Sequence, residues 1–331
     1  MKEIIELFLE NNDAIGKVKG TWAMQNVQLR CSALTPTIKD KKIDAERVNL
    51  ALKIIKDNTS WNSCFRSDNK LTVAITIALE EDMEGSLKEI VSIYDELKKE
   101  FFSSEYLILV AQVIFNARYR MDVNTAIKNT RVAYDYMKKN HKYLTGSEDI
   151  SSAAAIATTT IDFEQTFNEI EECYETLKKE KFGSRDNIQA LSHILSLVNL
   201  PPKEKCEKVI EMKLALKENK VSLDGYYLPL LGIVSFLTDN KQEFIKEVID
   251  VSNEIKGHKG FGNFVLGKSV RNMIAMILVS MKYLDNLDTD LKNNIIDNTN
   301  NATLTVVIAM HMAICAATTA AVVIASTSSN S

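Results

Sequence analysis

A segment of this chain recurs 80 residues further along, and this internal repeat limits the fold more than any other feature. Residues 74–114 align without a gap with residues 154–194 (174 − 94 = 80 for the paired tyrosines). The identical pairs include Asp82/Asp162, Glu84/Glu164, Ile90/Ile170, Tyr94/Tyr174, Leu97/Leu177, Phe102/Phe182 and Ser104/Ser184. Unrelated segments of this length share about two or three identities. The alignment therefore marks a duplicated structural unit.

The unit itself divides into two halves. At half the spacing (134 − 94 = 40), Tyr94-Asp95 falls on Tyr134-Asp135, and a more diverged copy runs from Glu247 to Phe261. Repeats of about 40 residues are typical of helical hairpins that stack on their neighbours. The sequence thus predicts an all-α fold in which tandem hairpins form an α-solenoid, a right-handed α-α superhelix.

Each copy carries the spacing of an amphipathic helix. Apolar side chains recur at i, i+3, i+4 and i+7 from Ile90 to Leu97 and again from Ile170 to Leu177, which places them on one helical face. Ser104 and Ser184 are predicted N-caps of the following helices. The helices predicted in this way are 2–13, 19–33, 43–57, 68–80, 83–100, 104–119, 123–140, 147–160, 163–181, 184–198, 202–219, 226–238, 241–256, 264–284 and 303–325.

Three regions follow from this pattern. Residues 1–60 are predicted to hold N-terminal helices and a partial repeat. Residues 61–285 hold the array, in copies at about 61–140, 141–220 and 221–285. Residues 286–331 combine a polar linker with an apolar C-terminal helix.

Composition agrees with helices and narrows the ligands. The 331 residues include only 11 Gly and 4 Pro, so turns that need them are scarce. The net charge of −4 has no basic excess for binding phosphate backbones, and nucleic acid is not an expected partner. Five cysteines and four histidines form no paired metal-binding spacing, so no metal and no cofactor are expected. Widely spaced, odd-numbered cysteines predict reduced thiols in the cytoplasm.

One phosphate-binding pattern is interpreted as a coincidence. Gly262, Gly267, Lys268 and Ser269 fit G-x-x-x-x-G-K-[ST], but that loop should follow a β-strand, and here it follows a predicted helix. The repeat offers another explanation, because Gly262-Asn263 aligns with Gly183-Ser184, as a hairpin turn and an N-cap. No nucleotide site is predicted.

Other reactive side chains also have simple structural explanations. His193 occupies a core position of its helix, where a buried neutral imidazole is more frequent than a ligand or a base. Acidic groups such as Glu80, Glu81 and Asp82 are spaced as solvated helical faces. No catalytic residue is assigned.

Residues 303–325 leave two readings open. This stretch of 23 residues carries no formal charge and is long enough to cross a bilayer. It also holds many Ala and Thr residues and lacks flanking Lys or Arg. A helix that packs on the array, or on a partner, is favoured over a membrane anchor, and any membrane association is expected through this segment.

Four segments resemble a known family: WNSCFRS (61–67), HKYLTGSEDI (141–150), NIQALSHILSL (187–197) and NMIAMIL (272–278). Together they resemble the bacterial family named domain of unknown function 4003, from about residue 40 to 285. The resemblance implies a Gram-positive bacterial, cytoplasmic protein and carries no activity, cofactor or site residue.

The leading hypothesis is a noncatalytic scaffold that binds a protein or peptide. The candidate binding surface consists of Trp61, Arg66, His141, Tyr143, Arg185 and Asp186. One alternative is an enzyme or small-molecule sensor with a pocket inside the helical array. A second alternative is a tail-anchored membrane adaptor.

Overall fold

A computed structural model describes residues 1–21, 26–67, 69–160, 162–223 and 225–285. These residues form α-helices joined by turns and short 3₁₀ segments, and they contain no β-strand. The predicted all-α class is confirmed. The predicted helix 303–325 lies outside the described residues.

The chain divides into two compact units. The N-terminal unit comprises Leu7–Met24 and Ser32–Phe163, and the C-terminal unit comprises Met1–Glu6, Gln25–Cys31 and Glu164–Ser331. Helix α1 (Lys2–Gly16) begins in the second of these and continues in the first.

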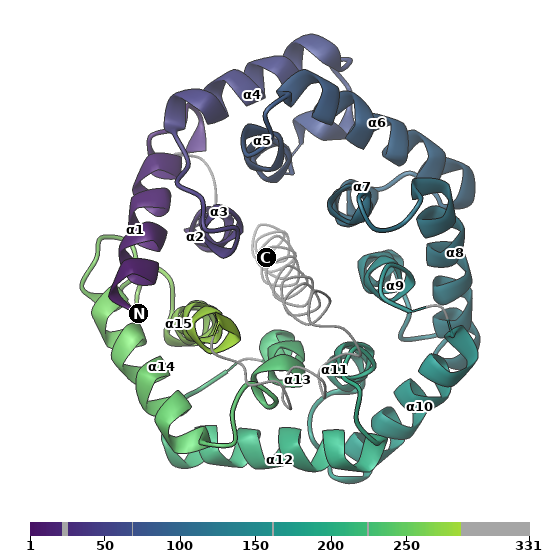
Figure 1. The fold of residues 1–331 in the computed structure, drawn as a ribbon, viewed down its shortest axis with the longest axis vertical. Helices are drawn as coiled ribbons and strands as arrows, with labels where there is room; N and C mark the ends of the chain where they lie inside the picture. Colours follow the sequence, from purple (N-terminus) through teal and green to yellow (C-terminus); the bar gives the residue numbers. More distant parts are fainter. Residues whose placement is uncertain (22–25, 68, 161, 224, 286–331) are drawn as a thin grey trace, which may run out of the picture. The chain divides into compact units, whose positions relative to one another are not determined.

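The N-terminal unit is built from two layers of helices. Besides most of α1, its elements are α3 (Leu34–Ile38), α4 (Ala45–Asn58), η2 (Cys64–Arg66), α5 (Lys70–Ala78), α6 (Met83–Glu100), α7 (Tyr106–Ala117), α8 (Val123–Asn140), η3 (Ser147–Asp149) and α9 (Ile150–Ala157). α4 packs on α5, α6 on α7 and α8 on α9. In Figure 1 the first member of each pair is seen lengthwise and the second end-on, so the two layers cross steeply.

The C-terminal unit has the same two kinds of helix. Its elements are α2 (Asn26–Ser32), α10 (Phe163–Lys179), α11 (Arg185–Leu195), α12 (Pro202–Glu218), η4 (Gly225–Leu230), α13 (Leu231–Val234), α14 (Lys241–Lys256) and α15 (Lys268–Asp285). α11 packs on η4 and α13, α12 on α13 and α14, and α14 on α15.

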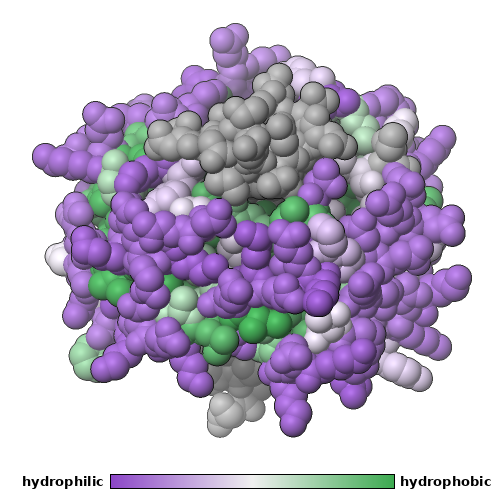
Figure 2. Space-filling view, turned by 60° about the horizontal axis from the view of Figure 1, so that its bottom comes forward, coloured by the Kyte–Doolittle hydropathy of each residue, from purple (hydrophilic) through white to green (hydrophobic). Residues whose placement is uncertain are grey.

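The sequence explains the difference between the two layers of helices. In α6 the side chains of Ile90, Ile93, Tyr94 and Leu97 are buried, as the helical spacing predicts, and polar side chains alternate with them. In α7 apolar residues occupy nearly every position, and Leu107 through Ala111 are all buried. A helix that is apolar all round must be covered on every side, so it forms the buried layer. Hydrophilic side chains dominate the face seen in Figure 2, with apolar ones gathered in smaller groups.

Caps fix where the helices begin. The Asp82 carboxylate accepts from the backbone N–H of Gly85 at 2.8 Å at the start of α6, and Asp122 accepts from Thr125 at 2.8 Å at the start of α8. Ser184 caps α11 as predicted, because its hydroxyl accepts from the Asn187 N–H. The same prediction is wrong for Ser104: α7 begins at Tyr106, and the buried Ser104 hydroxyl has no hydrogen-bond partner among the described residues.

Other predicted elements need correction. The helix predicted at 226–238 is the 3₁₀ segment η4 followed by the four-residue α13, because Pro229 lacks the N–H that a continuous α-helix needs. The helix predicted at 264–284 begins only at Lys268, so Asn263 is not its N-cap. In the helix predicted at 19–33, residues 19–20 lie in a turn.

Candidate functional site

Three aromatic side chains project from successive connections of the N-terminal unit. Trp61 follows α4 and is 85% exposed, Phe102 follows α6 and is 99% exposed, and Tyr143 follows α8 and is 95% exposed. Their spacing is constant (102 − 61 = 41 and 143 − 102 = 41). We call these three residues the aromatic row. Single exposed apolar residues are common on protein surfaces, but three aromatic rings at a constant spacing mark a candidate interaction site.

The Trp61 connection is held by Arg66. Its guanidinium donates to the backbone carbonyls of Lys56 and Thr59 at the end of α4. Next to it, the buried Phe65 ring packs edge-on against Tyr94, with 5.2 Å between ring centroids. Arg66 was predicted as a surface group for binding. In the structure, the Arg66 guanidinium caps the C-terminal end of α4, and Arg66 thereby positions the loop that carries Trp61.

At the second connection, Phe101 fixes the direction of Phe102. α6 ends at Glu100, and the Phe101 N–H donates to the Leu97 carbonyl. The Phe101 ring is 7% exposed and packs edge-on against Tyr134, with centroids 5.5 Å apart. With Phe101 turned inward, the next residue in the extended chain points to solvent.

The third connection is stiffened by backbone hydrogen bonds. The His141 N–H donates to Met137 at the end of α8, and Leu144 donates to the His141 carbonyl at 3.0 Å. The Gly146 N–H donates to the Asp149 carboxylate at 2.8 Å. Tyr143 therefore projects from an ordered turn, which His141 begins as the C-cap of α8.

The predicted binding surface is divided between the two units. Trp61, Arg66, His141 and Tyr143 belong to the N-terminal unit, whereas Arg185 and Asp186 are exposed in the first turn of α11 in the C-terminal unit. Phe102 was missed. The 41-residue spacing of the three aromatic residues was the signal that could have found it.

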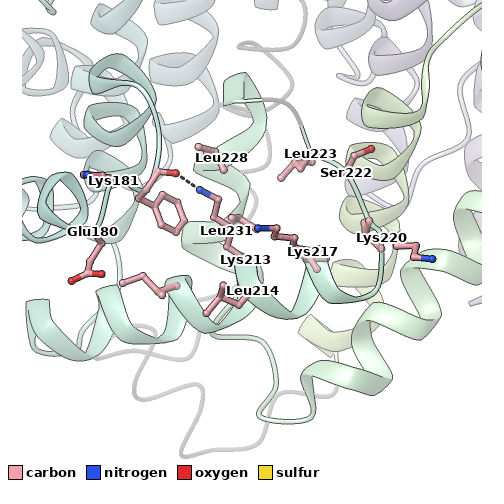
Figure 3. A pocket seen from close by; sticks show the side chains of 14 residues that line it. Glu180, Lys181, Lys213, Leu214, Lys217, Lys220, Ser222, Leu223, Leu228 and Leu231 are labelled. Atoms are coloured by element: carbon pink, nitrogen blue, oxygen red, sulfur yellow. Dashed lines mark hydrogen bonds between the residues drawn. The ribbon is translucent and has the colours of Figure 1, made fainter.

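A second candidate is a pocket of about 690 Å³ in the C-terminal unit. It lies between the turn after α10, the second half of α12 and the start of η4–α13 (Figure 3). It is lined by Glu180, Lys181, Phe182, Ile210, Lys213, Leu214, Leu216, Lys217, Lys220, Val221, Ser222, Leu223, Leu228 and Leu231. We call it the lysine pocket. This volume falls in the range that holds small organic ligands.

Lys213 is the central cation of the lysine pocket. Its ammonium group lies 4.0 Å from the centroid of the Phe182 ring and donates to the Phe182 carbonyl (Figure 3). Burial lowers the pKa of Lys213, and the positive charge of Lys217, one helical turn away, lowers it further. An anion bound here would relieve that repulsion.

The residues of the phosphate-loop pattern lie in a turn and in the start of α15. The N–H groups of Val265 and Leu266 both donate to the Gly262 carbonyl, and Gly267 has a φ of +85°. The Lys268 ammonium donates to the Lys220 carbonyl at 2.9 Å. The preceding element is α14, so the strand that such a loop normally follows is not in place.

His193 is 1% exposed, as its predicted core position requires. Among the described residues, no group of three or more His, Cys, Asp or Glu side chains could hold a metal ion. Within the same residues, no helix combines the length and the apolar character needed to cross a membrane.

Comparisons with known proteins extend the family resemblance, which the sequence showed in four segments, to most of the chain. A curated relative from Bacillus subtilis (strain 168), described as an uncharacterized protein YeaA, is 22% identical over 290 residues, which cover 83% of this chain and 82% of the relative. No solved structure matches. A family model described as a protein of unknown function (DUF4003) matches residues 13–313, and the chain belongs to this family.

Proposed function

We propose that this chain is a noncatalytic helical-repeat protein that binds an acidic segment of a partner protein through the aromatic row. In this proposal, the 40-residue hairpins form an α-solenoid, and equivalent connections present Trp61, Phe102 and Tyr143 along one edge. The observation that carries it is the near-complete exposure of three aromatic rings in the connections that follow α4, α6 and α8.

Aromatic residues at such positions are suited to protein recognition. Trp and Tyr lose little conformational entropy when they bind, bury large apolar areas, and are over-represented among the residues that dominate interface energies. Because each ring here sits on a loop held at both ends by a helix, the row is ordered before a partner arrives. That pre-organisation lowers the entropic cost of association.

Charge near the row supports an acidic partner. α4, α6 and α8 each carry lysine in the last turn, at Lys56, Lys98-Lys99 and Lys138-Lys139. Lys98 and Lys99 pair with carboxylates of α6, so the unpaired charge lies near Tyr143. Lys139 and Lys142 are exposed, and neither forms an ion pair with a described residue. Positive groups flanking exposed rings favour a segment in which acidic and apolar side chains alternate.

The proposed setting is the cytoplasm. Cys31, Cys64, Cys173 and Cys206 form no disulfide with one another in the described part of the chain, in keeping with a reducing compartment.

The test is a paired affinity purification from the natural host. The wild-type protein and the triple variant Trp61→Ser, Phe102→Ser and Tyr143→Ser would be tagged identically and expressed at equal levels. We expect one partner in near-stoichiometric yield on the wild type and its loss from the triple variant. A control variant, Tyr119→Ser with Phe264→Ser, removes exposed rings outside the row (81% and 107% exposed) and should retain the partner. Equal recovery from all three proteins would refute the proposal.

A further inference from the structure

The lysine pocket brings together positive charge and apolar surface. Lys181, Lys213, Lys217 and Lys220 line it together with one acid, Glu180. None of these four lysines forms an ion pair with a described carboxylate. In contrast, lysines outside the pocket, such as Lys205, Lys241 and Lys282, have carboxylate partners within 2.8 Å. The lining thus keeps an uncompensated positive charge.

The N-terminal unit contains the same arrangement in neutral form. There Arg131 of α8 lies over the Phe101 ring at 5.3 Å and donates to the carbonyl of the preceding residue, Glu100. Lys213 of α12 similarly lies over the Phe182 ring, but it donates to the carbonyl of Phe182 itself. Four residues along α8, Asp135 pairs with Arg131 at 2.8 Å.

In α12 the residue four positions after Lys213 is Lys217. One hairpin neutralises its own cation, and the other places a second cation at that point.

Two of the lysines occupy a backbone conformation that glycine normally takes. Lys181 has a φ of +51° and Lys220 a φ of +57°. Each follows the end of a helix, where the next N–H reaches back to the last turn: Phe182 to Leu177 and Val221 to Leu216. Glycine is the usual residue at such helix ends, and other residues there are strained. Both helices that border the pocket are thus followed by a lysine in this strained conformation.

The apolar part of the pocket is placed to hold a hydrocarbon chain. Leu214 is 54% exposed although it is a large apolar residue, and Leu223 is half-buried. Figure 3 shows Leu214 on one side of Lys213 and Leu228 on the other. Apolar side chains and the ammonium groups of Lys213 and Lys217 thus line the same pocket, so a ligand that fits both has an anionic end and an apolar remainder.

We propose that the lysine pocket binds a long-chain amphiphile with an anionic headgroup. The head, a carboxylate or a phosphate, lies between Lys213 and Lys217, with Lys220 at the rim of the pocket (Figure 3). The chain lies against Phe182, Leu214 and Leu228. This function is separate from the proposed partner binding, because its residues belong to the other unit.

The competing explanation is that the lysines only offset the negative ends of α10 and α12. Lys213 does contact a helix-end carbonyl. The side chains of Lys217 and Lys220, however, form no hydrogen bond with a described residue and are exposed. An explanation by helix dipoles predicts effects on stability alone, whereas the amphiphile proposal predicts effects on binding.

The test is a fluorescence titration with cis-parinarate, a naturally fluorescent fatty acid, below its critical micelle concentration and with the full-length protein. We expect saturable binding to the wild type and binding at least about tenfold weaker to Lys217→Asp, which copies the neutral pair of α8. Lys259→Asp makes the same charge change on an exposed loop residue outside the pocket and should bind like the wild type. Leu214→Gln should weaken binding without changing the charge.

Competitors separate the two parts of the ligand. Oleate or oleyl phosphate should displace the probe, and the stronger of the two identifies the headgroup. Neutral monoolein and inorganic phosphate alone should displace it at least about tenfold less effectively. The proposal is overturned if parinarate does not bind, if Lys217→Asp binds it as the wild type does, or if monoolein competes as well as oleate. Loss of the partner protein in the aromatic-row variant leaves all these results unchanged, so the two proposals fail independently.

Discussion

Lys205 of α12 and Glu169 of α10 form an ion pair, with 2.7 Å between Nζ and Oε2; the lysine side chain is fully buried and the glutamate side chain is 26% exposed. The pair joins two neighbouring amphipathic helices of the C-terminal unit. A buried ammonium that loses its partner keeps its full desolvation cost.

Replacement of Glu169 by Gln should therefore lower the free energy of unfolding by about 3 kcal/mol. The double variant Lys205→Met with Glu169→Leu removes both charges and should lie within about 1 kcal/mol of the wild type. Urea unfolding followed by circular dichroism measures both differences. If Glu169→Gln unfolds at the wild-type urea concentration, the Lys205 ammonium is not buried as described.

The adjacent residues Phe101 and Phe102 should respond in opposite ways to truncation. Phe101→Ala removes a buried ring and should cost about 3 kcal/mol or more of stability. Phe102→Ala removes a ring that is 99% exposed and should change stability by less than about 0.5 kcal/mol. Thermal unfolding of the two variants side by side is sufficient. A large loss for Phe102→Ala would place that ring in the core and remove it from the aromatic row.

Glycine at the two strained helix ends should stabilise the fold and weaken the lysine pocket. Lys181→Gly or Lys220→Gly relieves a positive φ, which should add about 0.5 to 1 kcal/mol each once the greater freedom of unfolded glycine is subtracted. The same variants lose a cation of the pocket and should bind parinarate more weakly. Differential scanning calorimetry and the titration measure the two effects on the same samples. A variant that gains no stability would contradict the strain, and one that binds normally would exclude that lysine from the site.

Amphiphile binding should weaken as pH rises into the alkaline range. An anion binds the protonated form of Lys213, and burial, together with Lys217, lowers the pKa of Lys213 in the free protein. The loss of affinity should thus begin at a lower pH than for an ordinary lysine. Replacement of Lys217 by Gln removes one cause of the shift and should move this loss to higher pH. Titrations of wild type and variant across alkaline pH test this, and a flat profile for both would exclude Lys213 from the headgroup site.

The same lowered pKa has a stability consequence of defined sign. The folded state holds the proton of Lys213 less tightly than the unfolded state, so the free-energy cost of burying the charged ammonium is full at low pH. This cost falls as pH rises from the pKa of Lys213 in the folded state to its pKa in the unfolded state. The stability of the wild type relative to Lys213→Met should therefore increase with pH in that window.

The long helices could be predicted closely from the sequence, because their apolar period, acidic starts and basic ends agree. The predicted ranges 83–100, 123–140 and 241–256 coincide with α6, α8 and α14. Elsewhere a single residue prevented the helix that the apolar spacing predicts. Pro229 converted one predicted helix into a 3₁₀ segment and a single α-helical turn.

The sites were harder to predict because identical residues take different places. Phe102 and Phe182 align in the internal repeat, yet Phe102 is 99% exposed and Phe182 is 4% exposed. Lys181 adopts a positive φ after α10 and turns Phe182 inward, whereas α6 ends without such a residue and buries Phe101. A shift of one residue at a helix end thus decides which ring meets solvent. The lysine pocket depends on the same helix-end geometry, and a linear spacing does not show it.

In the proposed function, the aromatic row forms a single protein-binding edge. Photo-crosslinking can test this, with p-benzoylphenylalanine placed at position 61, 102 or 143 in turn and the full-length protein expressed in its natural host. We expect all three positions to form adducts with the same partner protein, and the probe at the exposed position 264 to form none with it. Adducts with unrelated proteins at each position, or none at any of them, would contradict it.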